Sequence, residues 1–209
     1  MIYLPRSQLY PLTPRGIGSS EVECLTSYIN RLAWTYGIGP RLFIAEAILP
    51  NLSGSHSMQL FPKRLGPFCR ADAMSINAAG ENAVDWYNTL ERLTMRLDLR
   101  QLTLCSWASG LPPRGLLRKS PVWCPDCYTQ WQEHSLPIYQ PLYWMFQVMV
   151  VCLRHKTWLE ERCPACQKLQ SSIAVKTEAG YCTQCATWLG SSYSSGVKRE
   201  INDDIFTWQ

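Results

Sequence analysis

SPVWCPDCYTQ, residues 120–130, contains two cysteines with two residues between them, and the chain repeats this spacing three more times. The four pairs are Cys124 and Cys127, Cys152 and His155, Cys163 and Cys166, and Cys182 and Cys185. A turn of this length points two ligand atoms at one point, which is half of a tetrahedral zinc site. Eight such ligands predict two structural Zn²⁺ ions, each with four protein ligands and no coordination position left for water.

The order of the pairs along the chain favours two sequential sites. The halves of the second site lie fifteen residues apart, an ordinary zinc-ribbon spacing, whereas those of the first lie twenty-four apart. An interleaved, cross-braced pairing remains open, and His134 is an alternative ligand to His155. The sequential sets are Cys124, Cys127, Cys152 and His155 for the first site, and Cys163, Cys166, Cys182 and Cys185 for the second.

Other uses of these cysteines explain less of the pattern. A thioredoxin-like redox site needs one such pair on a βαβ unit, and a nucleophilic cysteine would use one thiol only. Cys24, Cys69 and Cys105 lie outside the pattern, and we expect them to be small core residues.

Composition describes an ordinary globular chain. Of the 209 residues, 46% are apolar and 17% are charged, with a net charge of +4. Residues 1–70 hold seven Lys or Arg against three Asp or Glu, so Lys63, Arg64 and Arg70 are weak candidates for phosphate contact. A solvated basic face is the other interpretation of these three residues.

The cellular location follows from what the sequence lacks. The first residues have no secretory leader pattern, and the longest apolar run, 143–153, is about half a membrane span. We therefore expect a cytoplasmic protein without a membrane partner, in which disulfides are not the explanation for the cysteines.

Helical periodicity dominates the first half. Ser20 and Glu23 form a capping-box pattern ahead of a helix that Gly37 ends. Pro40 suits the first position of a second helix, and Pro50 is expected to stop it.

Two further helices are expected after a long connection. One covers residues 81–93, and the next is capped by Asp98 and Gln101 and carries Trp107. Two helices joined by so short a turn resemble a helix-turn-helix in outline, although any small helical bundle contains such a pair.

The predicted fold is a mainly α, helix-turn-helix-like N-terminal domain followed by small α/β, zinc-ribbon-like modules. The expected divisions are an extended arm, a helical domain, a first zinc module with three cysteines and one histidine, a second zinc module with four cysteines, and a flexible tail. They cover residues 1–18, 19–118, 119–160, 161–189 and 190–209 respectively. The apolar residues at the end of the tail, Ile205, Phe206 and Trp208, either pack on their own domain or dock on a partner.

Three stretches resemble the TniQ family. SSEVECLTSYINRLAWTYG (19–37) is similar to its opening motif, and LRQLTLCSW (99–107) is similar to its Leu-Thr-Leu segment. The knuckle, Trp-containing segment, C-x-x-H and second knuckle then follow in the family's order within residues 123–166. The likeness covers residues 18–189, and it departs from the family where YTQWQEH replaces an acidic pair after the first knuckle.

The resemblance implies a non-catalytic target-selection adapter of a Tn7-like transposon. Such an adapter connects a target-recognition complex to an AAA+ ATPase regulator of the TnsC type, which recruits the transposase. The shortness of the chain favours the kind that works beside a CRISPR effector with guide RNA and binds target DNA weakly alone. No paired carboxylates with metal spacing and no nucleotide loop appear, so we expect neither the transposase nor the ATPase, and no small-molecule substrate.

Two other classes remain open. One is a stand-alone, zinc-containing protein that reads a DNA sequence, as a TnsD-like site reader or a regulator does. The other is an enzyme that uses the Cys152 and His155 pair, which predicts thiol reactivity that changes when zinc is removed.

Overall fold

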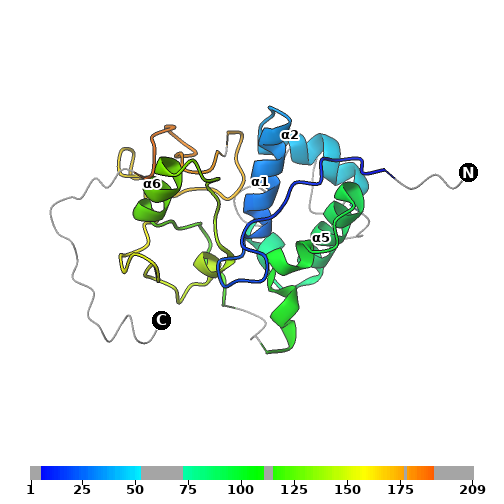
Figure 1. Ribbon diagram of the computed structural model, residues 1–209, viewed down its shortest axis with the longest axis horizontal. Coiled ribbons are helices and arrows are strands. Elements are labelled where there is room, and N and C mark those ends of the chain that lie inside the picture. The colour runs from blue at the N-terminus through cyan, green and yellow to red at the C-terminus, as the bar shows by residue number, and fades with distance from the viewer. Residues whose placement is uncertain (1–5, 53–72, 111–114, 177, 191–209) are drawn as a thin grey trace, which may run out of the picture.

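The computed structural model describes residues 6–52, 73–110, 115–176 and 178–190. Helices α1 (Leu25–Thr35), α2 (Pro40–Phe43) and α5 (Glu81–Thr94) gather in one half of the molecule (Figure 1). Helix α6 (Pro125–Glu133) lies in the other half among loops (Figure 1). In the described part of the chain, β structure consists of six isolated bridges. No helix there has the length and apolar character that crossing a membrane requires.

Helix α1 (Leu25–Thr35) is the centre of the helical half, and eight of its eleven residues are buried. It begins after Cys24, whose side chain makes no capping hydrogen bond, so the predicted capping box at Ser20 is wrong. The physical reason is Glu23, which is fully buried and bonds to Ser27 and Arg31 on the next two turns of the chain. Within the described residues, the one backbone N–H that its carboxylate accepts from is that of Arg15, not that of Ser20, which a capping box would use.

The second helical run is longer and less regular than the sequence predicts. Helix α2 (Pro40–Phe43) continues without a break as a π-helix, η1 (Ile44–Ile48), and as a 3₁₀ turn, η2 (Leu49–Asn51). Pro40 occupies an N-terminal position, as predicted. Pro50 lies inside η2 and does not end the helix before itself, because the first turn of a 3₁₀ segment needs no N–H from that position.

Helix α5 (Glu81–Thr94) forms where a helix was predicted, following the 3₁₀ segment η3 (Ala73–Asn77). The predicted fourth α-helix is wrong. Two 3₁₀ segments, η4 (Leu99–Leu102) and η5 (Leu104–Gly110), take its place, with Thr103 extended between them. Within the residues described, the two elements directly after α5 are therefore 3₁₀ segments and not a regular recognition helix.

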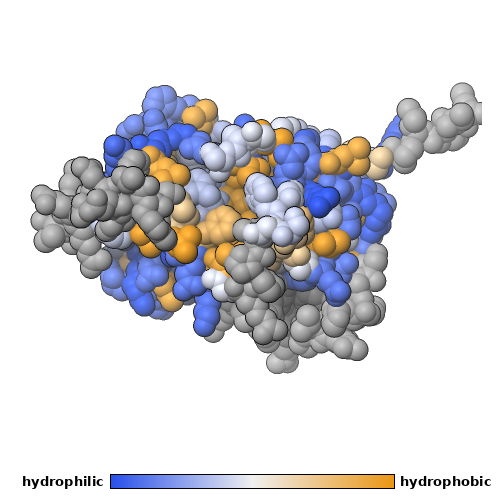
Figure 2. All heavy atoms as spheres, turned by 90° about the horizontal axis from the view of Figure 1, so that it is seen from below, coloured by the Kyte–Doolittle hydropathy of each residue, from blue (hydrophilic) through white to orange (hydrophobic). Residues whose placement is uncertain are grey.

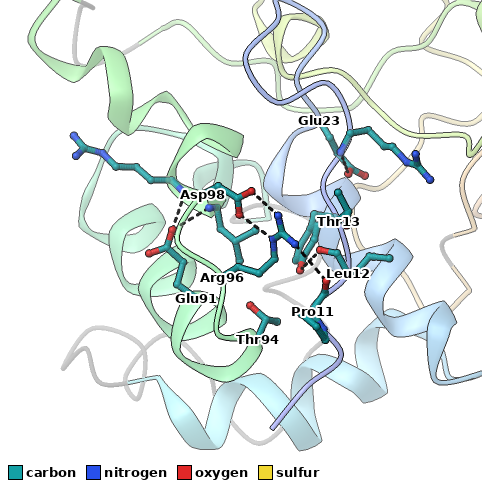
Figure 3. Close-up of polar contacts among 12 residues, drawn as sticks. Pro11, Leu12, Thr13, Glu23, Glu91, Thr94, Arg96 and Asp98 are labelled. Carbon is teal, nitrogen blue, oxygen red and sulfur yellow. Dashed lines mark hydrogen bonds and ion pairs between the residues drawn. The ribbon is translucent and has the colours of Figure 1, made fainter. Parts of the chain in front are cut away.

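Side chains around the α5–η4 turn show why Asp98 does not cap the segment that follows it (Figure 3). Asp98 accepts two bonds from the Arg96 guanidinium, at 2.6 and 2.9 Å, and makes no capping bond. Glu91 of α5 caps η4 instead, because its Oε1 accepts from the backbone N–H groups of Leu99 and Arg100 at 2.9 and 3.3 Å.

The described part of the N-terminal arm contains no helix or strand and is bound across the helical half. The N–H groups of Gln8 and Leu9 donate to the carbonyl of Leu93, at the end of α5. The Arg96 guanidinium donates to the carbonyl of Pro11, and the Tyr28 hydroxyl donates to that of Leu12 (Figure 3).

An aromatic cluster forms the core of the other half. Helix α6 (Pro125–Glu133) contributes Tyr128 and Trp131, and the 3₁₀ segment η6 (Leu142–Met145) contributes Trp144. Trp131 stacks on Tyr139 with 4.6 Å between ring centroids, and its centroid is 6.1 Å from that of Trp144. These rings supply much of the apolar area that so loop-rich a region can bury.

The two halves share their cores. Ile173, which lies between the last two cysteine pairs, is fully buried in the core of the helical half. In return, Val22 and Cys24 are buried among the aromatic residues of the α6 half. Backbone bonds join the same regions, because Cys24 N–H donates to Gln140 and Leu142 N–H donates to Val22. The packing therefore crosses the predicted domain boundaries.

Candidate metal centres

The eight predicted ligands form two groups in sequential order. Within each group, one ligand atom per residue lies within 4.8 Å of all the others. The interleaved alternative is not the arrangement found. The first centre consists of Cys124, Cys127, Cys152 and His155, and the second of Cys163, Cys166, Cys182 and Cys185.

The first centre joins the start of a helix to a turn. Cys124 is the N-cap residue of α6 and Cys127 lies in its first turn, where Pro125 favours a helix start. The bridge between Trp123 and Glu160 holds this helix start beside the loop that carries Cys152 and His155. His155 offers its Nδ1 atom, which is 3.2 Å from the sulfur of Cys127.

Three of the four ligand pairs have one backbone geometry. In each, the residue before the first ligand forms a β-bridge with the residue three places after the second ligand. The residue directly after the second ligand is left-handed in all three, with φ between 52° and 59°. These residues are Lys156, Gln167 and Ala186. The common turn brings both ligand atoms of a pair to the same side.

Distances between ligand atoms fit a tetrahedral ion. A metal–sulfur bond of about 2.3 Å places two sulfurs about 3.8 Å apart in a regular tetrahedron. The sulfurs of Cys127 and Cys152 are 3.6 Å apart. In the second centre, the distances are 3.6 Å from Cys163 to Cys185 and 3.7 Å from Cys166 to Cys182. The two groups can therefore hold two metal ions.

Polar neighbours surround the sulfurs. The Thr157 hydroxyl is 3.5 Å from the sulfur of Cys124, and the Thr187 hydroxyl is 3.2 Å from that of Cys185. The Thr187 hydroxyl lowers the pKa of Cys185 to about 6, which favours the thiolate that a metal needs.

Sequence reasoning did not find these threonines, although a signal was present. Each stands two residues after the last ligand of its turn and directly before a tryptophan, in HKTW (155–158) and CATW (185–188). The repeated Thr-Trp pair marks the equivalent positions of Thr157 and Thr187.

A buried amide supports the second centre. Gln170 donates to the sulfur of Cys182 at 3.4 Å and to the carbonyl of Lys168 at 3.0 Å. Its Oε1 atom accepts from the N–H and the hydroxyl of Thr183. One side chain therefore ties together the two turns that carry this centre.

The two centres differ in burial. In the first, all three cysteines are buried and only His155 is half-buried. In the second, Cys185 is exposed and Cys166 is half-buried. Solvent and chelators therefore have easier access to the second centre.

The remaining predicted residues lie outside both centres. His134 is exposed, and its Nδ1 atom is 2.8 Å from the carbonyl of Gln130 at the end of α6. Cys24 and Cys105 are buried, as expected of core residues, and burial raises the pKa of Cys24 to about 12. Cys69, Lys63, Arg64 and Arg70 lie outside the described residues.

The arrangement of the centres suits a structural role. Each has four protein ligands, so a bound ion has no protein-built opening for water or substrate. The ligands of each centre come from separate segments. An ion in the first centre would therefore join α6 to the turn at residues 152–155, and an ion in the second would join the turns at residues 163–166 and 182–185.

Comparison with known families gives one match and one negative result. The model of the TniQ family matches residues 14–159, more than half of the chain. The match includes the end of the arm from residue 14, the helical half and all ligands of the first centre, and it ends before the second centre. No curated protein matches the sequence.

Proposed function

The chain belongs to the TniQ family, whose members serve target selection by Tn7-like transposons, and we propose that it is a non-catalytic adapter in that process. It bridges a target-recognition complex and an AAA+ ATPase regulator of the TnsC type, which recruits the transposase. The recognition complex is a CRISPR effector with guide RNA, and the site of action is the cytoplasm.

One observation carries this proposal: the two halves of the molecule share their cores around two closed four-ligand centres. An adapter needs surfaces in a fixed relation to one another. Ile173 anchors the second centre in the helical core, and Cys24 anchors helix α1 in the α6 half. Surfaces on the two halves therefore keep their relative positions when each contacts a different partner.

We propose that both centres hold Zn²⁺. Three thiolates with one imidazole nitrogen, and four thiolates, are the donor sets of structural zinc sites. The near-tetrahedral spacing of the ligand atoms supports the same ion. Zinc would supply folding free energy and would take no part in a reaction.

Exposed apolar side chains offer contact area for protein partners. Apolar residues interrupt the polar surface in several places on the face drawn in Figure 2. Leu97 is 92% exposed and Trp107 is 49% exposed, on either side of η4. Large exposed apolar groups are typical of protein–protein contact surfaces when they lie together.

Capture by the ATPase tests the adapter role. Purified full-length chain would be mixed with the AAA+ regulator of the same element, with and without ATP and DNA, and recovered by pull-down. The proposal predicts ATP-dependent capture in the presence of DNA. Failure of capture with a regulator that is active and bound to DNA would contradict it.

A stand-alone DNA reader is the second candidate. It would bind one defined duplex tightly by itself, with a large preference over other sequences. The two 3₁₀ segments in place of a regular helix after α5 favour the adapter, because a recognition helix is what a reader of this type inserts into the major groove. Tight, sequence-specific binding without the ATPase would support the reader.

A further inference from the structure

A cavity of about 250 Å³ lies where the helical half meets the second metal centre. Its wall comes from three separate parts of the chain: the start of η3, the segment before Pro121, and the turns that carry the second centre. The polar side chains that line it include Lys119, Ser120, Lys168, Ser171, Ser172 and Gln184.

The charge of this cavity has one sign. Lys119 and Lys168 line it from different segments, and none of the described residues in its wall is acidic. Neither lysine forms an ion pair within the described part of the chain. Two ammonium groups in a wall without a carboxylate create a positive potential that attracts an anion.

The backbone that carries Lys168 is held in place by the second centre. The carbonyl of Lys168 accepts from the N–H of Cys163 at 3.1 Å and from the amide of Gln170 at 3.0 Å. Because Gln170 also bonds to Cys182, Lys168 is linked to both turns of that centre.

The backbone that carries Lys119 is held from the α6 half. The neighbouring Arg118 donates its N–H to the carbonyl of Met145 at 2.9 Å, and its guanidinium donates to the carbonyl of Phe146 at 3.0 Å. The two lysines therefore lie on segments whose backbone is braced by these hydrogen bonds.

We propose that this cavity binds a phosphate group of a nucleic-acid backbone, with Lys119 and Lys168 as its cationic contacts. Hydroxyl and amide groups of the wall would donate to the phosphate oxygens, and none of them reads a base. The contact is therefore independent of sequence, as backbone contacts are. The choice of nucleic acid as the source of the phosphate rests on the proposed function; the phosphate chemistry rests on the cavity.

Salt dependence of binding tests this inference. The full-length Lys119→Ala/Lys168→Ala variant and the original chain would be titrated with labelled duplex DNA of arbitrary sequence and with single-stranded RNA of equal length. Each lost phosphate contact reduces the slope of log K against log salt by about 0.9 for duplex DNA and about 0.7 for a single strand. The double variant should therefore lose about 1.8 from the duplex slope, or about 1.4 from the RNA slope.

A charge-matched control is Arg6→Ala/Lys176→Ala, which removes two exposed cationic side chains outside the cavity wall. The inference predicts that this control changes the slope by much less than the cavity variant does. A loss with duplex alone identifies DNA as the source of the phosphate, and a loss with RNA alone identifies RNA as the source. Equal slopes for both variants on both probes would overturn the inference.

Failure here is distinct from failure of the proposed function. The titration uses the chain and nucleic acid without the ATPase, whereas the adapter role is tested by capture on the ATPase. Metal content and circular dichroism would show whether each variant is folded. In a folded variant, a smaller slope of log K against log salt can be attributed to the lost lysines of the cavity.

Discussion

At the scale of single residues, Glu23 is the side chain that most directly joins the two halves. It is fully buried beside Arg31, at 2.5 Å, and it also accepts from the Ser27 hydroxyl. Burial raises the pKa of Glu23, whereas the Arg31 guanidinium and the Ser27 hydroxyl oppose this rise. Ser27 in turn accepts from the N–H of Gln140, so this network reaches from helix α1 into the α6 half.

Glu23→Gln should destabilise the protein by about 3 kcal/mol, because it leaves the half-buried guanidinium of Arg31 without its charged partner. Glu21→Gln is the matched control. Glu21 pairs with Arg154 at the same 2.5 Å, but its side chain is 34% exposed, and loss of such a surface pair changes stability by about 0–1 kcal/mol. Urea unfolding would measure both. Equal effects of the two changes would contradict the account of Glu23.

The threonines beside the sulfurs act at the same scale. Thr187→Val should weaken metal binding at the second centre by about tenfold, because partners that bond to metal ligands contribute about 10- to 100-fold to affinity. Thr157→Val should do the same at the first centre. Chelator competition would resolve the two, since each change is expected to alter release from one centre only. Unchanged release after both substitutions would refute this role.

At the scale of elements, the sequence predicted regular helices better than it predicted their ends. Helix α5 follows a clear apolar period, so it was predictable. The start of α1 was not, because the capping-box pattern cannot show that Glu23 is needed for a distant arginine. The first of the two 3₁₀ segments after α5 was missed for a similar reason: the cap of η4 comes from Glu91, outside the local pattern.

The role of Glu91 leads to a prediction at this scale. Glu91→Ala should cost about 1 kcal/mol, the usual loss for a side chain that caps backbone N–H groups, because Leu99 and Arg100 lose their acceptor. Asp85→Ala, on the same helix, is the control and should fall within about 0.5 kcal/mol of the original chain. Chemical denaturation would measure both, and a Glu91 effect no larger than that of Asp85 would be the opposite result.

The metal-ligand turns were the most predictable elements of the site. Four pairs with the same spacing required one geometry, and all eight ligand residues fall in the two groups that sequential pairing predicts. What the spacing could not show is the difference in burial between the centres, or the role of Gln170. Both depend on which distant segment packs against each turn.

At the scale of the whole molecule, the shared cores determine how the protein should respond to metal loss. Spacing and composition suggested separate modules, because sequence patterns report local structure. Ile173 nevertheless packs in the core of the helical half, and Cys24 packs in the core of the α6 half. No local sequence pattern contains such long-range contacts.

Removal of metal should therefore weaken the helical half as well as the α6 half. Hydrogen exchange measured before and after chelation should show faster exchange in α1, whose residues pack against Ile173. The second centre should release its metal first, because Cys185 is exposed. Unchanged protection of α1 in the metal-free chain would show that the halves are independent.

Counting the metal ions bound to the intact chain tests the central claim most directly. Native mass spectrometry of the full-length protein, with Cys127→Ser and Cys185→Ser as single-centre variants, would give the number and identity of the ions. The account predicts two zinc ions in the original chain and one in each variant. One ion or none in the original chain, or the loss of both from each variant, would contradict two separate structural centres.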